Sequence, residues 1–426
     1  MTMLHDQAGK PYLYVAHKEA GLSIYNISNP TAPVLVDTIP VTAFGSLDVM
    51  NLSQSGNYLY LALGNHFTNP QQGGMAIIDV TDPDNAVVTD YYIVPLSATG
   101  AGIVEVEGDF AYLGAMQSGL VVLNVADKNN ITFVSQLKPD INYPVNNPNA
   151  NLYNARGMVV KNSIVYLCYD AGGLRMINCT DKSNPKETGR YANPATFVPF
   201  NLPRAYNNIV VDGNYAYVSV DYCGLEVLNI SDTGNIKLTG WWNPYNCPNN
   251  NWFTSPSHTN ELYLNKVCKQ LFVSTGKSDL MVLDVSDPSN PDSCNYYGGI
   301  NNNIGTLGVS GYGNQIYLSY ICAFIPFASN WTGVKVLTYE PCPASAVEEI
   351  VKNNISIYPN PASEKIFIEG FASNSTGSTI RIYNILGEEM LRREFSGNTL
   401  EIKVKDWPAG LYFLQADEFV HKIIIH

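Results

Sequence analysis

The strongest constraint on the fold of this 426-residue chain is a pattern that occurs seven times. Each copy has an aromatic-rich strand, a short turn, an apolar strand often opened by Gly-Leu, and a polar turn. The paired strands begin near residues 12 and 21, 58 and 74, 111 and 119, 165 and 173, 216 and 224, 271 and 279, and 316 and 333. Successive copies lie about 45 to 55 residues apart, a period that suits a four-stranded β-propeller blade and is too long for leucine-rich or ankyrin units.

The apolar runs themselves exclude a helical repeat. They are short, β-branched and bounded by turn residues, whereas helices need apolar residues at i, i+3 and i+4. The third strand of a unit, such as residues 121–125, is apolar on both faces. Such a run indicates a strand covered on both sides, as between stacked blades.

The strand count is incomplete at both ends of the repeat region. A first strand precedes most copies, and a fourth follows most of them, as at residues 34–37, 87–90 and 132–135. The first copy lacks a clear first strand and the last copy lacks a clear fourth. Because ring closure usually needs one blade built from both ends, we expect residues preceding Met1 to supply the missing strand.

A polar turn with a regular composition follows the third strand. Its pattern is Asn/Asp-x-Ser/Thr-Asp/Asn-Pro, as at residues 26–30, 79–83 and 284–288. Asp, Asn and Ser side chains bond nearby backbone groups, and Pro fixes φ. The alternative is a calcium loop, but these segments lack its length and its terminal Glu. The pattern therefore predicts turns.

The apolar strand together with this turn resembles the LVIVD repeat, which is found in predicted surface propellers of bacteria and archaea. The likeness extends over roughly residues 10–340. It implies an all-β chain with a seven-bladed β-propeller in residues 1–340, and it implies almost nothing about mechanism.

The pattern changes after residue 340. Residues 341–353, with Pro341 and Pro343, have the composition of a linker, and residues 354–426 contain seven short strand-like runs. Seven strands in so short a segment predict a small Ig-like β-sandwich.

Four stretches of this segment resemble the C-terminal sorting domain of the type IX secretion system of Bacteroidetes. Their distinguishing residues are Tyr358, Pro359, Asn360, Pro361, Gly387, Gly410, Tyr412 and Lys422. The resemblance implies the type IX secretion machinery as a partner, export across the outer membrane, removal of this domain, and either release or attachment to surface lipopolysaccharide. In structural terms, Pro359 and Pro361 are expected to hold the entering chain extended, and Gly387 and Gly410 to allow turns with positive φ.

The beginning of the chain does not fit this exported location. Residues 1–6 are not followed by the basic segment and apolar core of a signal peptide. We therefore expect that the N-terminus is incomplete and that the mature protein is secreted or displayed at the cell surface.

Charge and composition exclude several partners. The formal net charge of −13 disfavours nucleic acid, and no stretch of about 18 apolar residues could form a transmembrane segment. The eight cysteines permit disulfides or scattered buried thiols, and neither alternative is preferred. They have no zinc-site spacing, and no phosphate-binding loop is present, so no metal and no cofactor are expected.

Long insertions identify one face of the propeller as the candidate ligand face. They fall in the loops from the second to the third strand and in the loops between blades, which emerge on the same face and are where functional residues concentrate. Asp170 and Asp221 occupy matching positions in adjacent blades. The candidate ligand-binding residues are Tyr153, Arg156, Asp170, Arg204, Tyr206, Asp221, Trp252 and His258.

Two functional hypotheses follow, beside a third possibility, a purely structural surface-layer component that has no selective ligand. Aromatic rings with amide side chains suit a glycan, a peptide or a surface protein, so the first is a non-catalytic binding propeller. The alternative is a glycan-active hydrolase or lyase that uses carboxylates on the elaborated face, since paired carboxylates can act as acid and base on a glycosidic bond. The alternative without a ligand is that the aromatic residues pack the loops and that Asn and Pro terminate the strands. No Ser/His/Asp elbow or metal-binding His pair is present, so no catalytic residue is assigned.

Overall fold

The computed structural model describes residues 2–67, 69–95, 97–197, 204–276, 278–299, 304–321, 332–340, 356–369, 378–385, 387–395, 399–416 and 419–426. The chain forms two compact units, residues 1–342 and 343–426. The predicted linker at residues 341–353 lies outside the described residues.

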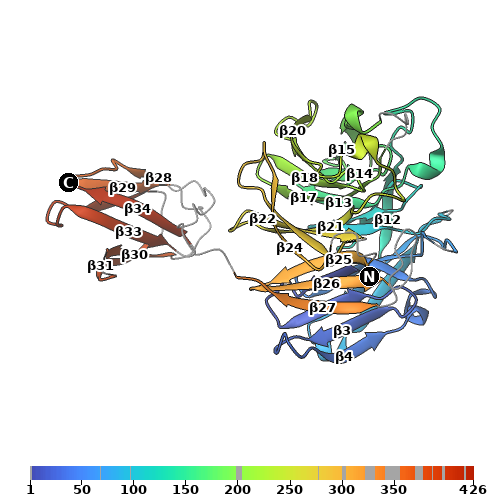
Figure 1. Ribbon diagram of the computed structural model, residues 1–426. Helices are drawn as coiled ribbons and strands as arrows, with labels where there is room; N and C mark the ends of the chain where they lie inside the picture. The colour runs from blue at the N-terminus through green and yellow to red at the C-terminus, as the bar shows by residue number, and fades with distance from the viewer. Residues whose placement is uncertain are drawn as a thin grey trace. The chain divides into compact units, whose positions relative to one another are not determined.

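The first unit is a β-propeller of seven antiparallel sheets (Figure 1). Blades 1 to 3 contain β1 (Thr2–His5), β2 (Tyr12–Ala16), β3 (Leu22–Asn26) and β4 (Val34–Ile39); β5 (Val49–Ser55), β6 (Tyr58–Leu63), β7 (Gly74–Asp79) and β8 (Val87–Ile93); and β9 (Ile103–Glu107), β10 (Phe110–Gly114), β11 (Leu120–Asn124) and β12 (Thr132–Leu137). Blades 4 and 5 contain β13 (Gly157–Lys161), β14 (Ile164–Cys168), β15 (Leu174–Asn178) and β16 (Lys186–Tyr191); and β17 (Tyr206–Asp212), β18 (Tyr215–Val220), β19 (Leu225–Asn229) and β20 (Lys237–Trp242). Blades 6 and 7 contain β21 (His258–Asn265), β22 (Gln270–Gly276), β23 (Leu280–Asp284) and β24 (Asp292–Tyr297); and β25 (Gly305–Tyr312), β26 (Gln315–Ile321) and β27 (Gly333–Thr338).

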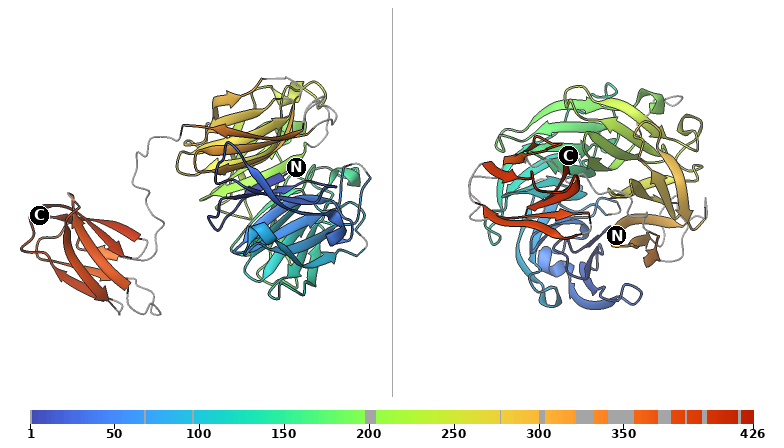
Figure 2. Two further views of the ribbon diagram at one scale, coloured as in Figure 1. Left: turned by 90° about the horizontal axis from the view of Figure 1, so that it is seen from below. Right: turned by 90° about the vertical axis from the view of Figure 1, so that its left-hand side faces the viewer.

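The blades are arranged around one axis, as the right-hand view of Figure 2 shows. The first strand of each blade is innermost and contacts the first strand of the next blade. The ring closes where β25 contacts β1, and the backbone N–H of His5 donates a hydrogen bond to Ser310 Oγ at 3.4 Å. All-β architecture and the seven-bladed ring are as predicted.

The expectation that blade 1 lacks its first strand was wrong. Residues 2–5 form β1, which pairs antiparallel with β2 from Thr2 opposite Ala16 to His5 opposite Leu13. Thr2 and Met3 are buried in the ring, although so short a run at the chain end shows no clear strand pattern. In blade 7 the described residues form three strands, in line with the missing fourth strand.

The core of the propeller lies between the blades. Each of seven apolar clusters joins neighbouring blades, and the last joins blade 7 to blade 1 through Met3, Val15 and Tyr317. In β11, Val121 and Leu123 pack toward blade 2, whereas Leu120 and Val122 pack toward blade 4. The prediction that the third strand is covered on both faces is confirmed.

The polar turns after the third strands are Asx turns, as predicted. The Asn26 side chain accepts a hydrogen bond from the N–H of Ser28 at 2.9 Å, and the Asp79 and Asp284 side chains accept from residues 81 and 286 at 2.8 Å. Glycine before the third strand is also required. In blade 5 Gly224 has φ of 79°, and a Cβ atom there would lie 2.1 Å from the carbonyl oxygen of Trp242.

The second unit is a two-sheet sandwich with the predicted seven strands. One sheet contains β28 (Ser356–Tyr358), β29 (Lys365–Glu369) and β32 (Thr399–Lys403), and the other contains β30 (Ser378–Asn384), β31 (Glu389–Phe395), β33 (Gly410–Ala416) and β34 (Phe419–Ile425). Its core includes Ile366, Ile382, Leu414 and Ile423, all fully buried. Short 3-10 helices η1 (Val41–Phe44), η2 (Pro83–Asn85), η3 (Ala150–Leu152), η4 (Pro194–Phe197) and η5 (Cys247–Asn249) occur in propeller loops. No helix in the described part of the chain is long and apolar enough to cross a membrane.

Candidate functional site

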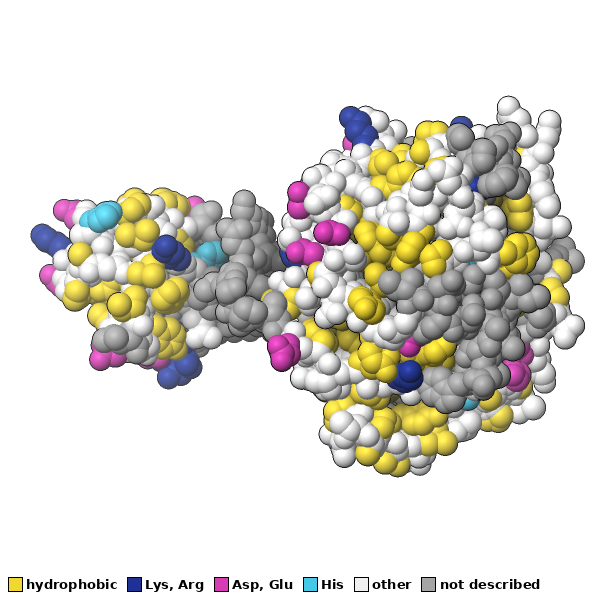
Figure 3. Space-filling model, viewed as in Figure 1, with side chains coloured by type: hydrophobic (Ala, Val, Ile, Leu, Met, Phe, Trp, Pro, Cys, Tyr) yellow, Lys and Arg dark blue, Asp and Glu magenta, His cyan; other side chains and the backbone are white. Residues whose placement is uncertain are grey.

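A cavity of about 330 Å³ lies at the end of the ring where the innermost strands begin. This is the face predicted from the long insertions. All seven blades or their connecting loops contribute to its lining, which consists of Thr2, Lys18, Met50, Asn51, His66, Phe67, Gly102, Arg156, Asn207, Asn208, Asp221, Trp252, His258, Asn260, Glu261, Leu307 and Ile321. On the side of the propeller that faces the viewer in Figure 3, few of the coloured side chains are charged and many are hydrophobic.

Bulges in the innermost strands direct side chains toward the cavity. In blade 5, Tyr206 pairs with Val220 and Asn208 with Ser219, so Asn207 has no opposite residue. Similar shifts place Met50, Asn260 and Leu307 at bulges of β5, β21 and β25. A bulge bends the strand and re-aims its side chains, which explains why polar and apolar residues of one strand both line the cavity.

A buried serine faces the bulge in three successive blades. The hydroxyl groups of Ser219, Ser274 and Ser319 accept hydrogen bonds from the N–H groups of Asn208, Glu261 and Gly308 at 2.9, 3.0 and 2.8 Å. Blades 1 to 4 have Ala16, Ala62, Gly114 and Cys168 at the corresponding position of the second strand. The serines therefore satisfy backbone donors that the bulges would otherwise leave without a partner.

A second repeated position follows the second strand. Lys18, Met116, Asp170 and Asp221 have φ values of 47°, 43°, 51° and 29°. Each forms an isolated bridge with the beginning of the next blade, at Val49, Ala155, Tyr206 and Thr259. The equivalence of Asp170 and Asp221 in adjacent blades is thus structural, and the same position brings Lys18 and Asp221 to the cavity.

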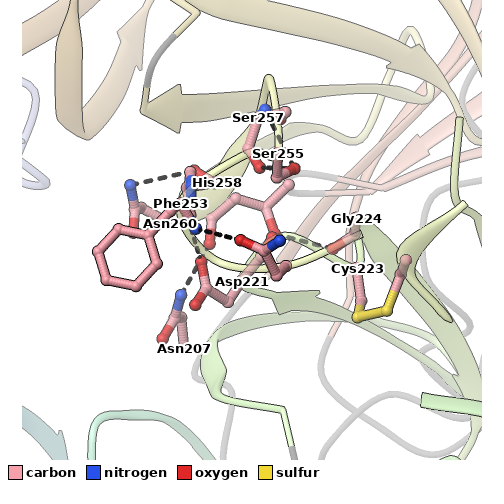
Figure 4. A network of polar contacts seen from close by, with 12 residues as sticks. Asn207, Asp221, Cys223, Gly224, Phe253, Ser255, Ser257, His258 and Asn260 are labelled. Carbon is pink, nitrogen blue, oxygen red and sulfur yellow. Dashed lines mark hydrogen bonds and ion pairs between the residues drawn. A yellow bond between two sulfur atoms is a disulfide. The ribbon is translucent and has the colours of Figure 1, made fainter. Parts of the chain in front are cut away.

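Asp221 and His258 form an ion pair or hydrogen bond at the cavity (Figure 4). The Asp221 Oδ1 and His258 Nδ1 atoms are 2.6 Å apart, and the His258 side chain is 2 % exposed. The Trp252 ring meets this imidazole edge to face, with centroids 5.6 Å apart. The Asp221 carbonyl accepts hydrogen bonds from the N–H and hydroxyl of Thr259 at 2.8 and 2.7 Å. The carboxylate therefore fixes the orientation of the histidine ring.

A disulfide holds the loop that carries Trp252 and leads to His258, the first residue of β21. Cys223, two residues after Asp221, is bonded to Cys247 in η5. The Cys247 N–H also donates to Asn243 Oδ1 at 2.9 Å. Cys168, Cys179 and Cys294 are free thiols, so disulfides and free thiols coexist. Cys322 and Cys342 lie outside the described residues.

Two cations of the lining have no polar partner among the described residues. No hydrogen bond or ion pair of the Arg156 guanidinium or the Lys18 ammonium occurs in that part of the chain, and the Lys18 Nζ atom lies 5.7 Å from the centroid of Phe67. Both side chains are half-buried. Burial, and to a lesser extent Arg156 and Lys18, lower the pKa of His66 to about 3, so this imidazole is neutral at physiological pH.

Carboxyl groups near these cations are also affected by burial. Burial raises the pKa of Glu261 to about 7, and it raises the pKa of Asp170 while the charge of Arg156 and a hydrogen bond from Asn154 oppose this rise. Glu105, on the innermost strand of blade 3, also has its pKa raised to about 7 by burial. In the described part of the chain, no group of three His, Cys, Asp or Glu residues is arranged to hold a metal ion.

Four of the eight predicted ligand-binding residues line the cavity, namely Arg156, Asp221, Trp252 and His258. The other four lie outside its lining. Tyr153, in the loop before β13, and Tyr206, at the beginning of β17, are each 1 % exposed, and the Tyr206 hydroxyl donates to Glu226 Oε2 at 2.6 Å. Asp170 accepts from Asn154 at 2.8 Å, and the Arg204 guanidinium lies 5.0 Å from the Tyr222 ring centroid.

Sequence reasoning missed several residues that line the cavity. Among them are Lys18, Asn51, His66, Phe67, Asn207, Asn260 and Glu261. One signal was present in the sequence. Serine occupies a position in the second strands of blades 5, 6 and 7 where blades 1 to 4 have Ala, Gly or Cys, and it lies opposite the bulges that carry Asn207, Asn260 and Leu307.

The sorting-motif residues connect the two ends of the sandwich. The Asn360 side chain donates to the Lys422 carbonyl at 2.8 Å and accepts from the Ile424 N–H at 2.9 Å. The chain bends at residues 359–361 instead of continuing extended, because these hydrogen bonds attach it to the last strand. Gly387 has φ of 81°, but Gly410 begins β33 without a left-handed backbone, so the expectation for Gly410 was wrong. The Tyr412 hydroxyl donates to the Pro408 carbonyl at 2.7 Å, and Tyr358 bonds Glu369.

Comparisons with protein families agree with both parts of the fold. Residues 356–426 match the model described as "Secretion system C-terminal sorting domain". Residues 9–40, 48–92, 100–138, 203–243 and 270–297 match the model of the LVIVD repeat. These segments fall in blades 1, 2, 3, 5 and 6.

Solved structures of low identity support the fold alone. The β-propeller domain of Myceliophteria thermophila Cps50 (Swd1) aligns with a TM-score of 0.54 and 8 % identity over 80 % of this chain and 97 % of that chain. Saccharomyces cerevisiae Sqt1 aligns with a TM-score of 0.51 and 9 % identity over 100 % of this chain and 95 % of that chain.

One curated relative is similar over a short region. An endo-acting ulvan lyase of Formosa agariphila is 34 % identical over 67 residues, which are 16 % of this chain and 13 % of the lyase. The chain thus spans about one eighth of the length of the relative that it matches.

Proposed function

Because this chain is an LVIVD-repeat propeller with a type IX secretion C-terminal sorting domain, we propose that it acts outside the cell as a non-catalytic glycan-binding protein. The sorting domain implies secretion across the outer membrane, with the propeller as cargo. The ligand occupies the cavity at the end of the ring. Release from the cell or attachment to surface lipopolysaccharide follows removal of the sorting domain.

The lining of the cavity carries this proposal. Asn51, Asn207, Asn208 and Asn260 offer amide donors and acceptors, and Trp252 and Phe67 offer aromatic faces. A pyranose ring presents hydroxyl groups at its edge and C–H groups on its faces, so amides and aromatic rings together suit it. The cavity volume of about 330 Å³ is at the lower end of the range for small-molecule sites, which fits one or two sugar rings of a longer chain.

Binding by the full chain to a glycan and peptide array tests the proposal. We expect selective glycan binding that Trp252→Ala weakens by about tenfold or more, because an aromatic platform contributes on the order of 1–2 kcal/mol. Tyr296→Ala removes an aromatic ring that is 58 % exposed outside this cavity and is the matched control. Equal loss in both variants, or binding to peptides alone, would contradict the proposal.

A glycan lyase or hydrolase is the second candidate, and the Asp221–His258 pair favours it. A histidine oriented by a carboxylate can act as a base, and Glu261, with its pKa near 7, could exchange a proton at neutral pH. The short similarity to an ulvan lyase is compatible with this candidate. Incubation with acidic and neutral polysaccharides tests it. Accumulation of shortened products with the full chain, and their loss in His258→Gln, would establish enzymatic cleavage over simple binding.

A further inference from the structure

The two cations of the cavity are held in place through their backbones. Lys18 exchanges both backbone hydrogen bonds with Val49, at 3.0 and 3.1 Å, and the N–H of Arg156 donates to the Cys168 carbonyl at 3.0 Å. The side chains therefore start from fixed points on the rim. Their charges have no hydrogen-bonding or ion-pair partner within the described residues, although they are half-buried.

Neighbouring carboxylates are committed elsewhere. Asp221 is paired with His258 at 2.6 Å, and Asp170 accepts a hydrogen bond from the Asn154 amide at 2.8 Å. Glu261 carries a reduced negative charge near neutral pH, because burial raises its pKa to about 7. The charge of Arg156 acts on Asp170 and Glu261 through space, but the described residues contain no ion pair between them. A partly buried cation without an ion-pair partner is costly, so the cavity has positive charge available for a ligand in a chain whose net charge is −13.

We propose that Lys18 and Arg156 bind the carboxylate or sulfate groups of an acidic glycan in this cavity, an inference that rests on the proposed glycan-binding function and names its ligand class. The guanidinium group of Arg156 can form two parallel hydrogen bonds with one carboxylate or sulfate. The ammonium group of Lys18 supplies a point charge from blade 1, on a different blade from Arg156.

A glycan fits this lining better than an acidic peptide does. The Asn207 side-chain oxygen is buried and accepts no hydrogen bond in the described structure, while its amide nitrogen donates to the Thr259 carbonyl at 2.8 Å. An acceptor in that state suits a ligand hydroxyl group. Trp252 and Phe67 add aromatic surface to the same lining. One sugar ring can therefore form ionic, hydrogen-bonding and apolar contacts with the cavity.

Titration of the full chain with three oligosaccharides tests the inference. The probes are oligogalacturonate as the carboxylated glycan, carrageenan oligosaccharide as the sulfated glycan, and cellohexaose as the neutral glycan, with polyglutamate as the acidic peptide. We expect Arg156→Ala and Lys18→Ala each to weaken binding of an acidic glycan by about 10- to 100-fold, since a charged hydrogen bond contributes on the order of 1.5–3 kcal/mol. Preference for one of the two acidic glycans identifies the anionic group.

Lys161→Ala is the matched control, because Lys161 ends the same innermost strand that Arg156 precedes and its side chain is exposed. It should bind as the unchanged protein does. Thermal melting of all variants checks that each is folded.

The outcomes separate this inference from the proposed function. If neutral cellohexaose binds in a Trp252-dependent manner and Arg156→Ala has no effect, the cavity binds glycans but the acidic class is wrong. If polyglutamate binds and no glycan does, the glycan class is wrong. If no probe and no arrayed glycan binds, both proposals fail.

Discussion

At the scale of single residues, two buried polar networks lie in blades 4 and 5. Arg175 is fully buried and donates to the Gly172, Asp140 and Tyr143 carbonyls and to Glu187. In the next blade, the Tyr206 hydroxyl joins Glu226 to the N–H of Asn193, at 2.6 and 3.0 Å. Such groups stabilise only when their partners are present, so Arg175 holds the loop before β13, and Tyr206 and Glu226 hold Asn193 at the beginning of the next loop.

Glu226 makes stability depend on pH. Burial raises its pKa from 4.5 to about 7, so the folded state keeps the proton over a range where the unfolded chain has lost it. The contribution of Glu226 to the free energy of unfolding is therefore fully present below the pKa of this group in the unfolded chain. It is lost as the pH rises through the pKa of the group in the folded protein, and the loss is about 3 kcal/mol. We expect Glu226→Gln to remove this share of the pH dependence. Urea unfolding on both sides of the range measures it, with exposed Glu19→Gln as the control; an unchanged slope in Glu226→Gln would exclude the assignment.

At the scale of secondary-structure elements, the bulged innermost strands set the shape of the cavity. Backbone N–H groups at the bulges of three of these strands donate hydrogen bonds to the hydroxyl groups of Ser219, Ser274 and Ser319. We expect Ser219→Ala to lower the free energy of unfolding by about 1–3 kcal/mol, because a buried N–H then lacks its acceptor. Chemical denaturation measures this change. Ser231→Ala, which removes an exposed hydroxyl bonded to Asn229, should change stability little, and an equal effect would refute the role of Ser219.

The disulfide between Cys223 and Cys247 stabilises a second element, the loop before β21. Its cross-link encloses residues 24 positions apart in sequence, and a loop of this size contributes about 3 kcal/mol in the chain-entropy model. We expect the double variant Cys223→Ser, Cys247→Ser to lose about this much stability and to exchange its amide hydrogens faster at residues 246–258. Hydrogen exchange followed by mass spectrometry measures it. Faster exchange spread over the whole propeller, instead of this loop, would contradict the assignment.

The repeat and the two-domain pattern could be predicted from the sequence because they depend on short-range alternation and turn chemistry. Residues 26–30, for example, encode an Asx turn through side chains that bond their own backbone. The cavity depends instead on contacts between blades. Lys18 and Arg156 are 138 positions apart in the sequence, and no local pattern indicates that they line the same cavity. Tyr206 was selected because its loop is long, but its ring is directed into the blade toward Glu226.

At the scale of the whole molecule, the propeller and the sorting domain have separate cores. We expect deletion of residues 356–426 to leave the propeller folded, with its melting transition unchanged, and to abolish its appearance outside the cell, because the deleted segment is the matched sorting domain. Fractionation of the native host with an antibody against the propeller measures this. Continued export of the truncated chain would show that the export signal lies outside residues 356–426.

The disulfide between Cys223 and Cys247 can form only at a certain stage of export. Cytosolic thiols are kept reduced, whereas disulfides form beyond the inner membrane. A newly made chain therefore carries Cys223 and Cys247 as thiols in the cytosol, and the cross-link that holds the loop before β21 forms only after the chain has passed the inner membrane. The rim of the cavity near Asp221 thus has its covalent constraint only in the oxidising compartments beyond the cytosol.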